Sequence, residues 1–246
     1  MEITSMNIGI FFIGTGNYIN FFENYYDNCE KYLLPNLNKT YFCFTDAEFD
    51  GDVPDNIKVI PTESYTWPDA TLKRFHTILK PREEYSSLDY LIYLDADMLV
   101  NEVINEDEFS FDSDFFGVHH PGFYKKEQVF PYEKRSMSQA YVSSGDTYWQ
   151  GCFWGGKTNS VIELCEVLSE RVDIDLQKNI IAEWHDESHI NKFFLENSER
   201  VFTFNPEYAF PEVYDTDPDK DLNYPNIDPE KRKIIHLLKN HNEIRK

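Results

Sequence analysis

Short apolar runs alternate with segments of helical spacing through the first half of this chain. Four such runs predict strands: buried strands at 7–13 and 89–94, and short strands at 41–45 and 57–60. The segments 19–34 and 70–79 carry apolar residues at helical spacing and predict helices, the second with Asp69 as its N-cap. Strands that alternate with helices indicate an α/β fold with a mostly parallel, nucleotide-binding sheet.

The pattern loosens after about residue 110, although further elements are still predicted. Strands are expected at 115–118 and 148–154, and helices at 160–172 and 186–195. The glycines that follow at 155–156 predict either a turn or a close approach of the backbone to a ligand. Because no repeat or interdomain linker separates the two halves, we expect one domain over residues 1–246.

Charge and cysteine content narrow the class of protein. Asp and Glu outnumber Lys and Arg by 44 to 23, for a formal net charge of −21, which disfavours nucleic acid and anionic membranes as partners. The four cysteines form no C-x-x-C pair and favour a reducing compartment. We find no signal-peptide pattern and no apolar stretch of about 18 residues, and therefore expect a cytoplasmic protein without a membrane anchor.

The motif Asp95-Ala96-Asp97 is the most informative chemical feature of the chain. It ends the apolar run 89–94, and open α/β sheets bind their ligands at the carboxyl ends of strands. Two carboxylates spaced in this way can face one hard cation, such as Mn²⁺, whose shell is completed by phosphate oxygens. This pattern predicts a metal-held diphosphate of a nucleotide-sugar, while the alternative is that both residues only cap a loop or helix.

Two glycine- and histidine-containing motifs are ambiguous by themselves. The turn at Gly14-Thr15-Gly16 lacks the third glycine of a dinucleotide fingerprint, so it is either a plain turn or a turn beside a base on which Tyr18 stacks. His185 and His189 have the spacing of zinc proteases, but aspartate follows the first histidine where those enzymes have glutamate. Zinc-dependent hydrolysis is therefore a poor match.

Acidic and basic side chains near the C-terminal half also allow two readings each. Asp186 and Glu187 either line a cleft or complement a helix dipole, and local sequence favours the dipole. Lys239 and Arg245 either belong to a solvated tail or fold over a diphosphate.

Taken in order, segments from about residue 7 to 245 resemble glycosyltransferase family 6. That family includes the histo-blood-group A and B transferases, the α-1,3-galactosyltransferase and soluble bacterial relatives. The segments that carry the resemblance are Phe44-Thr45-Asp46, Trp67 with Asp69 and Arg74, Asp95-Ala96-Asp97, His120 through Tyr124, Tyr132 through Arg135 with Ser138 through Tyr141, Gly155-Gly156, Trp184 through His189 with Asn191-Lys192, and Lys239 with Arg245.

The resemblance implies a GT-A fold, an α/β architecture in which a nucleotide-binding half is fused to an acceptor-binding half. The halves are expected at about 7–118 and about 119–246. The family pattern implies that Phe11, Ile13 and Tyr18 hold uridine. It also implies that Asp95 and Asp97 bind Mn²⁺ on the UDP diphosphate.

Further site residues follow from the same resemblance. Arg74 and Asp186 match residues at the donor sugar, and Lys239 and Arg245 match cations that close over the diphosphate. Glu187 matches the glutamate that stabilises or traps positive charge at the anomeric carbon, which would give retention of configuration.

The acceptor site is implied less completely. His120 and Trp184, with Glu187, match residues that contact the acceptor. Pro131 and Pro211 replace acceptor-site residues of the blood-group enzymes, so the identity of the acceptor stays open.

The donor-selecting triplet reads Gln150-Gly151-Cys152, and its last residue is at least as bulky as alanine. This favours UDP-galactose over UDP-N-acetylgalactosamine. Because both aspartates of the motif are kept, we expect metal dependence. The predicted activity is a retaining α-1,3 transfer of galactose or N-acetylgalactosamine to a β-galactoside glycan. The alternatives are a module that binds UDP-sugar or glycan without transfer, and a UDP-sugar hydrolase.

Overall fold

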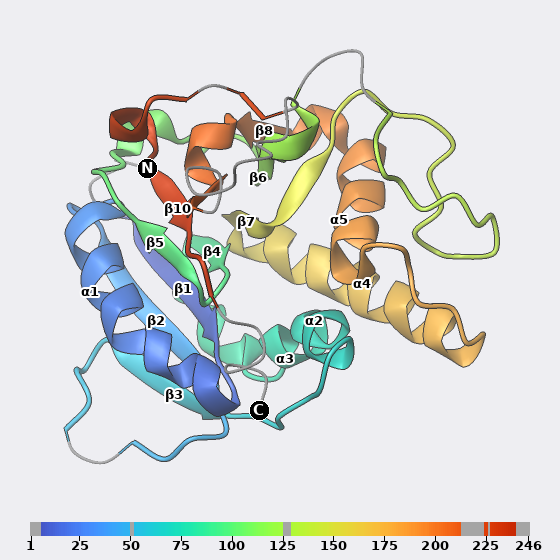
Figure 1. Ribbon diagram of the computed structural model, residues 1–246. Coiled ribbons are helices and arrows are strands. Elements are labelled where there is room, and N and C mark those ends of the chain that lie inside the picture. The colour runs from blue at the N-terminus through green and yellow to red at the C-terminus, as the bar shows by residue number, and fades with distance from the viewer. Residues whose placement is uncertain (1–5, 50–51, 125–128, 213–223, 226, 240–246) are drawn as a thin grey trace.

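The strand β1 (Asn7–Ile13) lies in the interior of the main sheet of the molecule. A computed structural model describes residues 6–49, 52–124, 129–212, 224–225 and 227–239 (Figure 1). The five inner residues of β1 are buried, as expected for a strand that is covered on both faces. It pairs in parallel with β2 (Asn38–Thr45) on one side and with β4 (Tyr90–Leu94) on the other.

These strands belong to a seven-stranded sheet of order β3-β2-β1-β4-β7-β6-β8. The remaining members are β3 (Ile57–Pro61), β6 (Phe115–His119), β7 (Trp149–Lys157) and β8 (Val201–Phe204). Only the pairings of β7 with β4 and β6 are antiparallel. The prediction of a mostly parallel α/β sheet is therefore confirmed.

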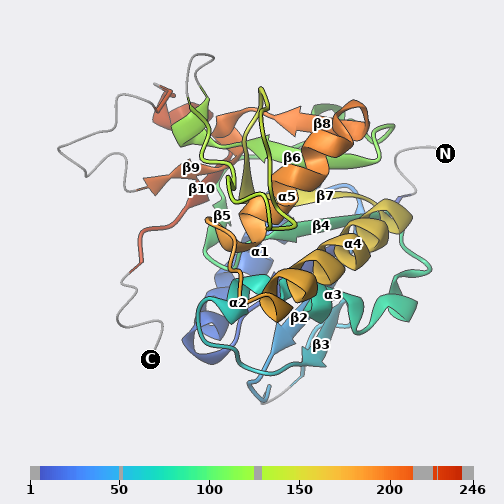
Figure 2. The same ribbon diagram turned by 90° about the vertical axis from the view of Figure 1, so that its right-hand side faces the viewer.

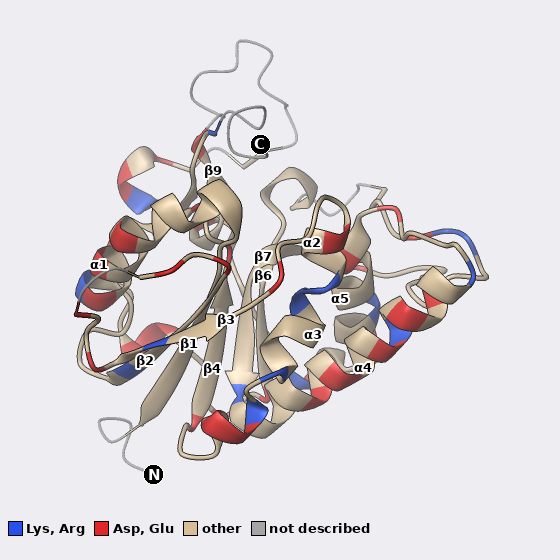
Figure 3. Cartoon of the chain, turned by 90° about the horizontal axis from the view of Figure 1, so that it is seen from below, with Lys and Arg blue, Asp and Glu red and all other residues tan. Residues whose placement is uncertain are grey.

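Helices cover both faces of the sheet. The helix α1 (Phe22–Tyr32) lies on one face, whereas α3 (Arg74–Leu79), α4 (Thr158–Gln177) and α5 (His185–Glu196) lie on the other (Figures 1 and 2). The alternation of side chains along β1 divides the core accordingly, because Phe12 packs with α1 and Phe11 packs with α3. Figure 3 marks the acidic and basic positions along α1 and α4, the helices that cover the two faces of the sheet.

Two predicted helices are interrupted. The segment predicted at 19–34 begins as a 3-10 turn (Gly16–Phe21) before α1. The segment predicted at 70–79 is divided at Lys73 into α2 (Asp69–Leu72) and α3. The expectation that Asp69 is the N-cap was wrong, because Pro68 occupies that position and Asp69 lies in the first turn.

The paired glycines at the end of the predicted strand 148–154 lie inside β7. A Cβ on Gly155 would lie 2.2 Å from the carbonyl oxygen of Leu91, and one on Gly156 would lie 2.1 Å from that of Asp114. Gly156 also has φ +155°. The close approach is therefore to the neighbouring strands β4 and β6, and neither a terminal turn nor a ligand explains it.

A second sheet brings the C-terminal segment to the edge of the first. Its order is β5-β10-β9, with β5 (Met98–Val100), β10 (Ile234–His236) and β9 (Phe210–Pro211). β10 is antiparallel to β5 and parallel to β9. Single 3-10 turns connect other elements, at Arg82–Tyr85, Glu106–Glu108, Pro121–Phe123, Ser198–Arg200, Pro206–Tyr208 and Pro229–Lys231. No helix within the described ranges is long and apolar enough to cross a membrane.

Candidate active site

A cavity of about 880 Å³ lies at the carboxyl ends of β1 and β4. This is the edge at which open α/β sheets bind ligands. Ile13 and Tyr18 line it from the end of β1, and Asp95 and Asp97 line it from the end of β4. The segments 62–67 and 236–239 line it as well. The structure thus brings together two of the three predicted uridine contacts, Ile13 and Tyr18, with the acidic motif and Lys239.

Phe11 and Arg245 do not join this group. The Phe11 ring is fully buried and packs against the rings of Phe42, Phe44 and Tyr85 in the core. Its carbonyl oxygen accepts a hydrogen bond from the Tyr25 hydroxyl at 2.9 Å. Arg245 lies outside the described residues.

Asp95 is held by groups on three elements. The Tyr93 hydroxyl donates to its Oδ1 at 2.5 Å, and Arg74 Nη1 lies 3.2 Å from the same oxygen. The backbone amide of Asp95 donates to the carbonyl oxygen of Cys152 on β7 at 2.9 Å. Because residues two apart on a strand share a face, Tyr93 and Asp95 project in the same direction, and this contact was open to prediction from sequence.

Asp97 is a buried carboxylate with cationic neighbours. It is 2% exposed, and its Oδ2 contacts Lys239 Nζ and lies 3.1 Å from His236 Nε2. Lys239 Nζ also lies 5.3 Å from the centre of the Tyr18 ring. The prediction that Lys239 lies over the diphosphate region remains a prediction, but its side chain does reach the acidic motif.

The two aspartates suit a hard cation that takes most of its ligands from a substrate. Within the described ranges, no group of three or more His, Cys, Asp or Glu side chains is arranged to hold a metal ion. Mg²⁺ sites of nucleotide enzymes commonly use one or two carboxylates together with substrate phosphates and water. Asp95 and Asp97, both on the wall of the cavity, match that donor set.

Arg74 connects the acidic motif to helix α5. Its side chain is 9% exposed, and Nη1 lies 3.2 Å from Asp95 Oδ1 and 3.1 Å from Asp186 Oδ2. Nη1 also donates to the carbonyl oxygen of Gly151 at 3.1 Å. Burial lowers the pKa of Arg74, but Asp186, Tyr93 and Asp95 raise it above the ordinary value, so the guanidinium is charged.

The first turn of α5 points inward at the same place. Asp186 is 6% exposed, and burial raises its pKa to about 6 although Arg74 opposes the change. Local sequence favoured a helix-dipole role for this acidic turn, and the structure adds that the Asp186 carboxylate is buried beside Arg74. Glu187 accepts hydrogen bonds from the Tyr148 hydroxyl and the Gly151 amide, both at 2.8 Å. Burial raises its pKa to about 7, and these two hydrogen bonds lower it.

The predicted donor-selecting triplet lies on β7 between these groups. A Cβ on Gly151 would lie 3.3 Å from Glu187 Cβ and 3.5 Å from Asp186 Oδ2, so the absence of a side chain there leaves room for both carboxylates. The Cys152 side chain is buried, and burial raises the pKa of its thiol. Gln150 Oε1 is buried and has no hydrogen-bond partner among the described residues.

The predicted acceptor residues lie beyond Glu187. His120 caps the 3-10 turn Pro121–Phe123, and its Nδ1 accepts from the Gly122 amide at 3.0 Å. Its ring centre is 5.8 Å from that of Tyr148, and burial lowers its pKa to about 4. Trp184 precedes α5 and is 49% exposed, which leaves its ring open to a ligand.

Sequence reasoning did not single out Tyr93, Tyr148 or His236. Tyr148 immediately precedes the triplet strand, but the contact between its hydroxyl and Glu187 spans 39 residues along the chain. His236 is 139 residues from Asp97. No local pattern indicates which distant residues will meet, so the contacts of Tyr148 and His236 depend on the tertiary fold.

This fold and site define a GT-A-like glycosyltransferase domain. The cavity at the carboxyl ends of β1 and β4 carries the acidic motif, and Arg74, which lines it, pairs with Asp186 on α5. The sequence model described as "Glycosyltransferase family 6" matches residues 1–246, and the chain belongs to that family. It is therefore a hexosyltransferase.

Individual relatives agree with this assignment. The chain is 34% identical over 215 residues to the O-antigen biosynthesis glycosyltransferase WbnI of Escherichia coli, which covers 85% of this chain and 90% of that protein. It is 29% identical over 257 residues to the histo-blood group ABO system transferase 2 of Rattus norvegicus, a match that covers 99% of this chain and 73% of that protein. It is 28% identical over 218 residues to the globoside alpha-1,3-N-acetylgalactosaminyltransferase 1 of Homo sapiens, a match that covers 84% of this chain and 61% of that protein.

Proposed function

We propose that this protein is a metal-dependent, retaining α-1,3-glycosyltransferase. It transfers galactose or N-acetylgalactosamine from a UDP-sugar to a β-galactoside glycan. The observation that carries the proposal is the contact of Arg74 with both Asp95 and Asp186, at 3.2 and 3.1 Å. This contact puts the group that would bind the diphosphate next to the helix turn that would contact the sugar. The name of the globoside relative, an alpha-1,3-N-acetylgalactosaminyltransferase, supports the α-1,3 linkage and the sugar class.

The leaving-group side of the reaction uses the acidic motif and Lys239. Asp95 and Asp97 would hold the divalent cation, which supplies positive charge for the departing diphosphate. Lys239, whose Nζ now contacts Asp97, would add a second positive charge on that side. Tyr18, over which that ammonium lies, is available to contact the nucleoside.

The sugar side of the reaction uses Glu187. When the glycosidic bond to UDP breaks, positive charge develops at the anomeric carbon, and an ionised carboxylate nearby stabilises or traps it. The Gly151 amide and the Tyr148 hydroxyl hold the two oxygens of Glu187 in a fixed orientation. They also favour the ionised form against the effect of burial.

The donor preference rests on the triplet. The buried Cys152 side chain is adjacent to Gly151, whose backbone contacts both Arg74 and Glu187. The Cys152 side chain limits the room for an N-acetyl group, which favours UDP-galactose over UDP-N-acetylgalactosamine. His120 and the exposed Trp184 ring would contact the acceptor, since an indole face packs against sugar C–H groups.

A screen of donors against acceptors tests the proposal. UDP-galactose, UDP-N-acetylgalactosamine and UDP-glucose are each incubated with lactose, N-acetyllactosamine and 2′-fucosyllactose, with Mn²⁺ or with EDTA. We expect an α-1,3-linked product by NMR, with Mn²⁺ and with UDP-galactose as the better donor. UDP release that does not depend on an acceptor would identify a hydrolase instead. A shift in melting temperature with donor and metal, but without UDP release, would identify a binding module.

A further inference from the structure

The C-terminal strand β10 is bonded directly to the acidic motif. In the antiparallel pairing of β10 with β5, His236 lies opposite Met98, the residue that follows Asp97. The amide of Leu237 donates to the Asp97 carbonyl oxygen at 2.9 Å. The His236 side chain lies 3.1 Å from the Asp97 carboxylate through Nε2. Backbone and side chain of the C-terminal strand therefore both contact this one aspartate.

The chemistry of the two groups gives the contact a direction. An ionised carboxylate only accepts hydrogen bonds, so Nε2 of His236 carries the proton and donates to Asp97 Oδ2. Carboxylates that bind metals are themselves oriented by outer hydrogen bonds, and loss of such a partner weakens metal binding. Asp97 is 2% exposed, so its orientation depends on protein groups more than on water.

We propose that His236 is a positioning residue of the metal site, which orients the Asp97 carboxylate toward the cation. The inference rests on the metal-binding role that the proposed function gives to Asp95 and Asp97. Lys239 contacts the same oxygen from a position after the end of β10, whereas the β10–β5 ladder fixes His236. The proposed function assigns Lys239 to the diphosphate, which leaves His236 as the group assigned to orient Asp97.

Two consequences follow for the protein. The affinity for the divalent cation depends on a residue of the C-terminal segment, although the two carboxylates lie in the first half of the chain. The pairing of β10 with β5 therefore also organises the metal site, in addition to closing the small sheet.

Direct measurement of metal binding in three full-length variants tests the proposal. His236→Leu removes the hydrogen bond and retains an apolar side chain. His236→Gln retains an N–H donor at a similar distance from the backbone. Ile235→Ala disturbs β10 at a neighbouring residue whose side chain projects to the other face of the strand. Mn²⁺ affinity is measured in the presence of UDP by titration calorimetry and from the EPR signal of free Mn²⁺.

We expect His236→Leu to weaken Mn²⁺ binding by about 10- to 100-fold. The Mn²⁺ affinities of His236→Gln and Ile235→Ala should stay within about 3-fold of that of the natural protein, because both variants retain a hydrogen-bond donor to Asp97. UDP binding in EDTA and the melting temperature without metal should differ little between His236→Leu and Ile235→Ala. This comparison distinguishes a positioning role from a general weakening of the strand.

Three results would overturn the inference. Equal Mn²⁺ affinity of His236→Leu and the natural protein would reject the role of His236 and leave the proposed function intact. Equal weakening by Ile235→Ala would assign the effect to β10 as a whole. If the natural protein with UDP binds no Mn²⁺, the metal role of Asp95 and Asp97 fails first, and the role of His236 fails with it.

Discussion

The backbone amide of Gly151 donates to Glu187 Oε2 at 2.8 Å, which joins the donor-selecting strand to the carboxylate proposed to act at the anomeric carbon. The other oxygen of Glu187 accepts from the hydroxyl of Tyr148, the residue that directly precedes β7. The proposed donor-selecting triplet and the proposed catalytic carboxylate are therefore joined directly by a hydrogen bond. A change in either one is expected to alter both the choice of donor and turnover.

Replacement of Glu187 by glutamine tests its role in turnover. Glu187→Gln keeps the size of the side chain and an acceptor oxygen but removes the negative charge. We expect kcat to fall by about 100- to 1,000-fold, as for loss of a group that stabilises transition-state charge. UDP affinity, measured by calorimetry, should stay within about 3-fold because the charge acts on the sugar and not on the nucleotide.

The control for this change is Glu183→Gln, four residues earlier, where the side chain is exposed. It should leave kcat unaltered. A near-normal kcat for Glu187→Gln would remove Glu187 from the chemistry.

Activity is expected to rise with pH through the pKa of Glu187. Burial raises that pKa to about 7, and the ionised form is the active one. Tyr148→Phe removes a hydrogen bond that lowers this pKa, so the acid limb of kcat/KM for the donor should move to higher pH. The measurement is a pH profile from about pH 5.5 to 8.5 for both proteins.

The same pKa has a consequence of opposite sign for stability. The folded value of about 7 exceeds the ordinary value of 4.5, so the folded state binds more protons between these values. The contribution of Glu187 to stability is therefore present below about pH 4.5 and is lost as the pH rises to about 7. If the acid limb of the pH profile does not move in Tyr148→Phe, Glu187 is not the group whose ionisation controls activity.

Loss of either aspartate of the acidic motif should remove metal-dependent activity. Asp95→Asn and Asp97→Asn each replace a charged oxygen ligand by a neutral amide. We expect turnover with Mn²⁺ to fall by about 100-fold or more, since the cation supplies several kcal/mol of charge stabilisation. Turnover of the natural protein should also be lost in EDTA.

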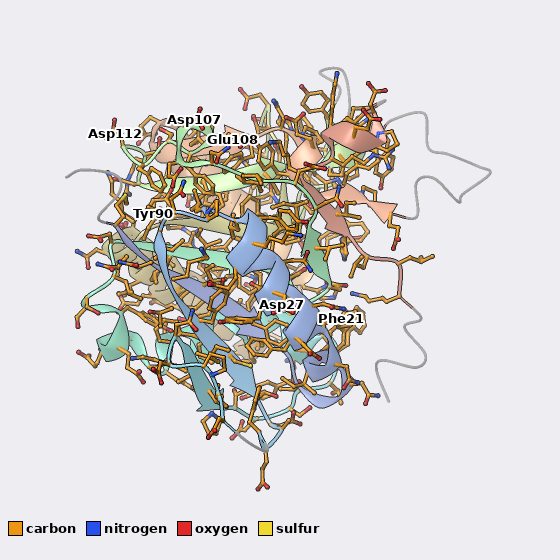
Figure 4. All side chains as sticks on the ribbon, turned by 90° about the vertical axis from the view of Figure 1, so that its left-hand side faces the viewer. Phe21, Asp27, Tyr90, Asp107, Glu108 and Asp112 are labelled. Atoms are coloured by element: carbon orange, nitrogen blue, oxygen red, sulfur yellow. The ribbon has the colours of Figure 1, made fainter. Side chains whose placement is uncertain are left out.

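Asp112→Asn is the matched control for these two variants. Asp112 is exposed and lies at the periphery of the molecule, on the loop before β6 (Figure 4). Asp112→Asn should show the same turnover with Mn²⁺, and the same loss of turnover in EDTA, as the natural protein. Full turnover of the natural protein in EDTA would reject the metal requirement.

Arg74→Met should destabilise the fold more strongly at high pH than at low pH. The change leaves the buried Asp186 carboxylate without its cation, which costs about 3 kcal/mol when the carboxylate is charged. Burial already raises the pKa of Asp186 to about 6, and loss of Arg74 raises it further. The penalty should therefore grow as the pH rises from about 5 to 8, when measured by urea denaturation.

Lys73→Met is a suitable control, because Lys73 pairs with the half-exposed Asp173 at 3.0 Å. An exposed pair of this kind contributes less than about 1 kcal/mol. Equal penalties for Arg74→Met at both pH values would show that Asp186 is not the group left unpaired.

Glu133 is predicted to hold the turn that carries Trp184. It is 2% exposed and accepts hydrogen bonds from the amide and guanidinium of Arg135 and from the Glu183 amide at 2.8 Å. Glu133→Gln should cost about 2 kcal/mol, a moderate value because the Arg135 side chain is half-exposed and screened. It should also raise KM for the acceptor with little effect on KM for the donor.

The pH dependence of this site has the opposite sign to that of Glu187. Burial raises the pKa of Glu133, but its hydrogen bonds with Arg135 and Glu183 outweigh burial and lower that pKa to about 2. The stabilisation is therefore present above the ordinary value of 4.5 and is lost as the pH falls toward 2. An unchanged KM for the acceptor in Glu133→Gln would limit Glu133 to a structural role.

Much of the large sheet was predictable from local pattern. The strands near 7–13, 41–45 and 89–94 were found because both faces of a covered parallel sheet are apolar, which gives continuous apolar runs. The strand near 57–60 lies at the edge of the sheet and is only partly buried, but its short apolar run was also found. The small strands β5, β9 and β10 were not found. They contain only two or three residues each, and they pair segments that are far apart in the chain.

The sequence by itself determined six strands of the large sheet, the helical segments that cover it, the acidic motif at the end of β4 and the residue types of the site. These depend on short-range periodicity and on side-chain chemistry, which are readable along the chain. Only the tertiary structure decided that Arg74 meets Asp95 and Asp186, that Tyr148 and Gly151 hold Glu187, and that His236 reaches Asp97. Contacts across tens of residues depend on sheet order and strand register, which the packing of the whole core selects.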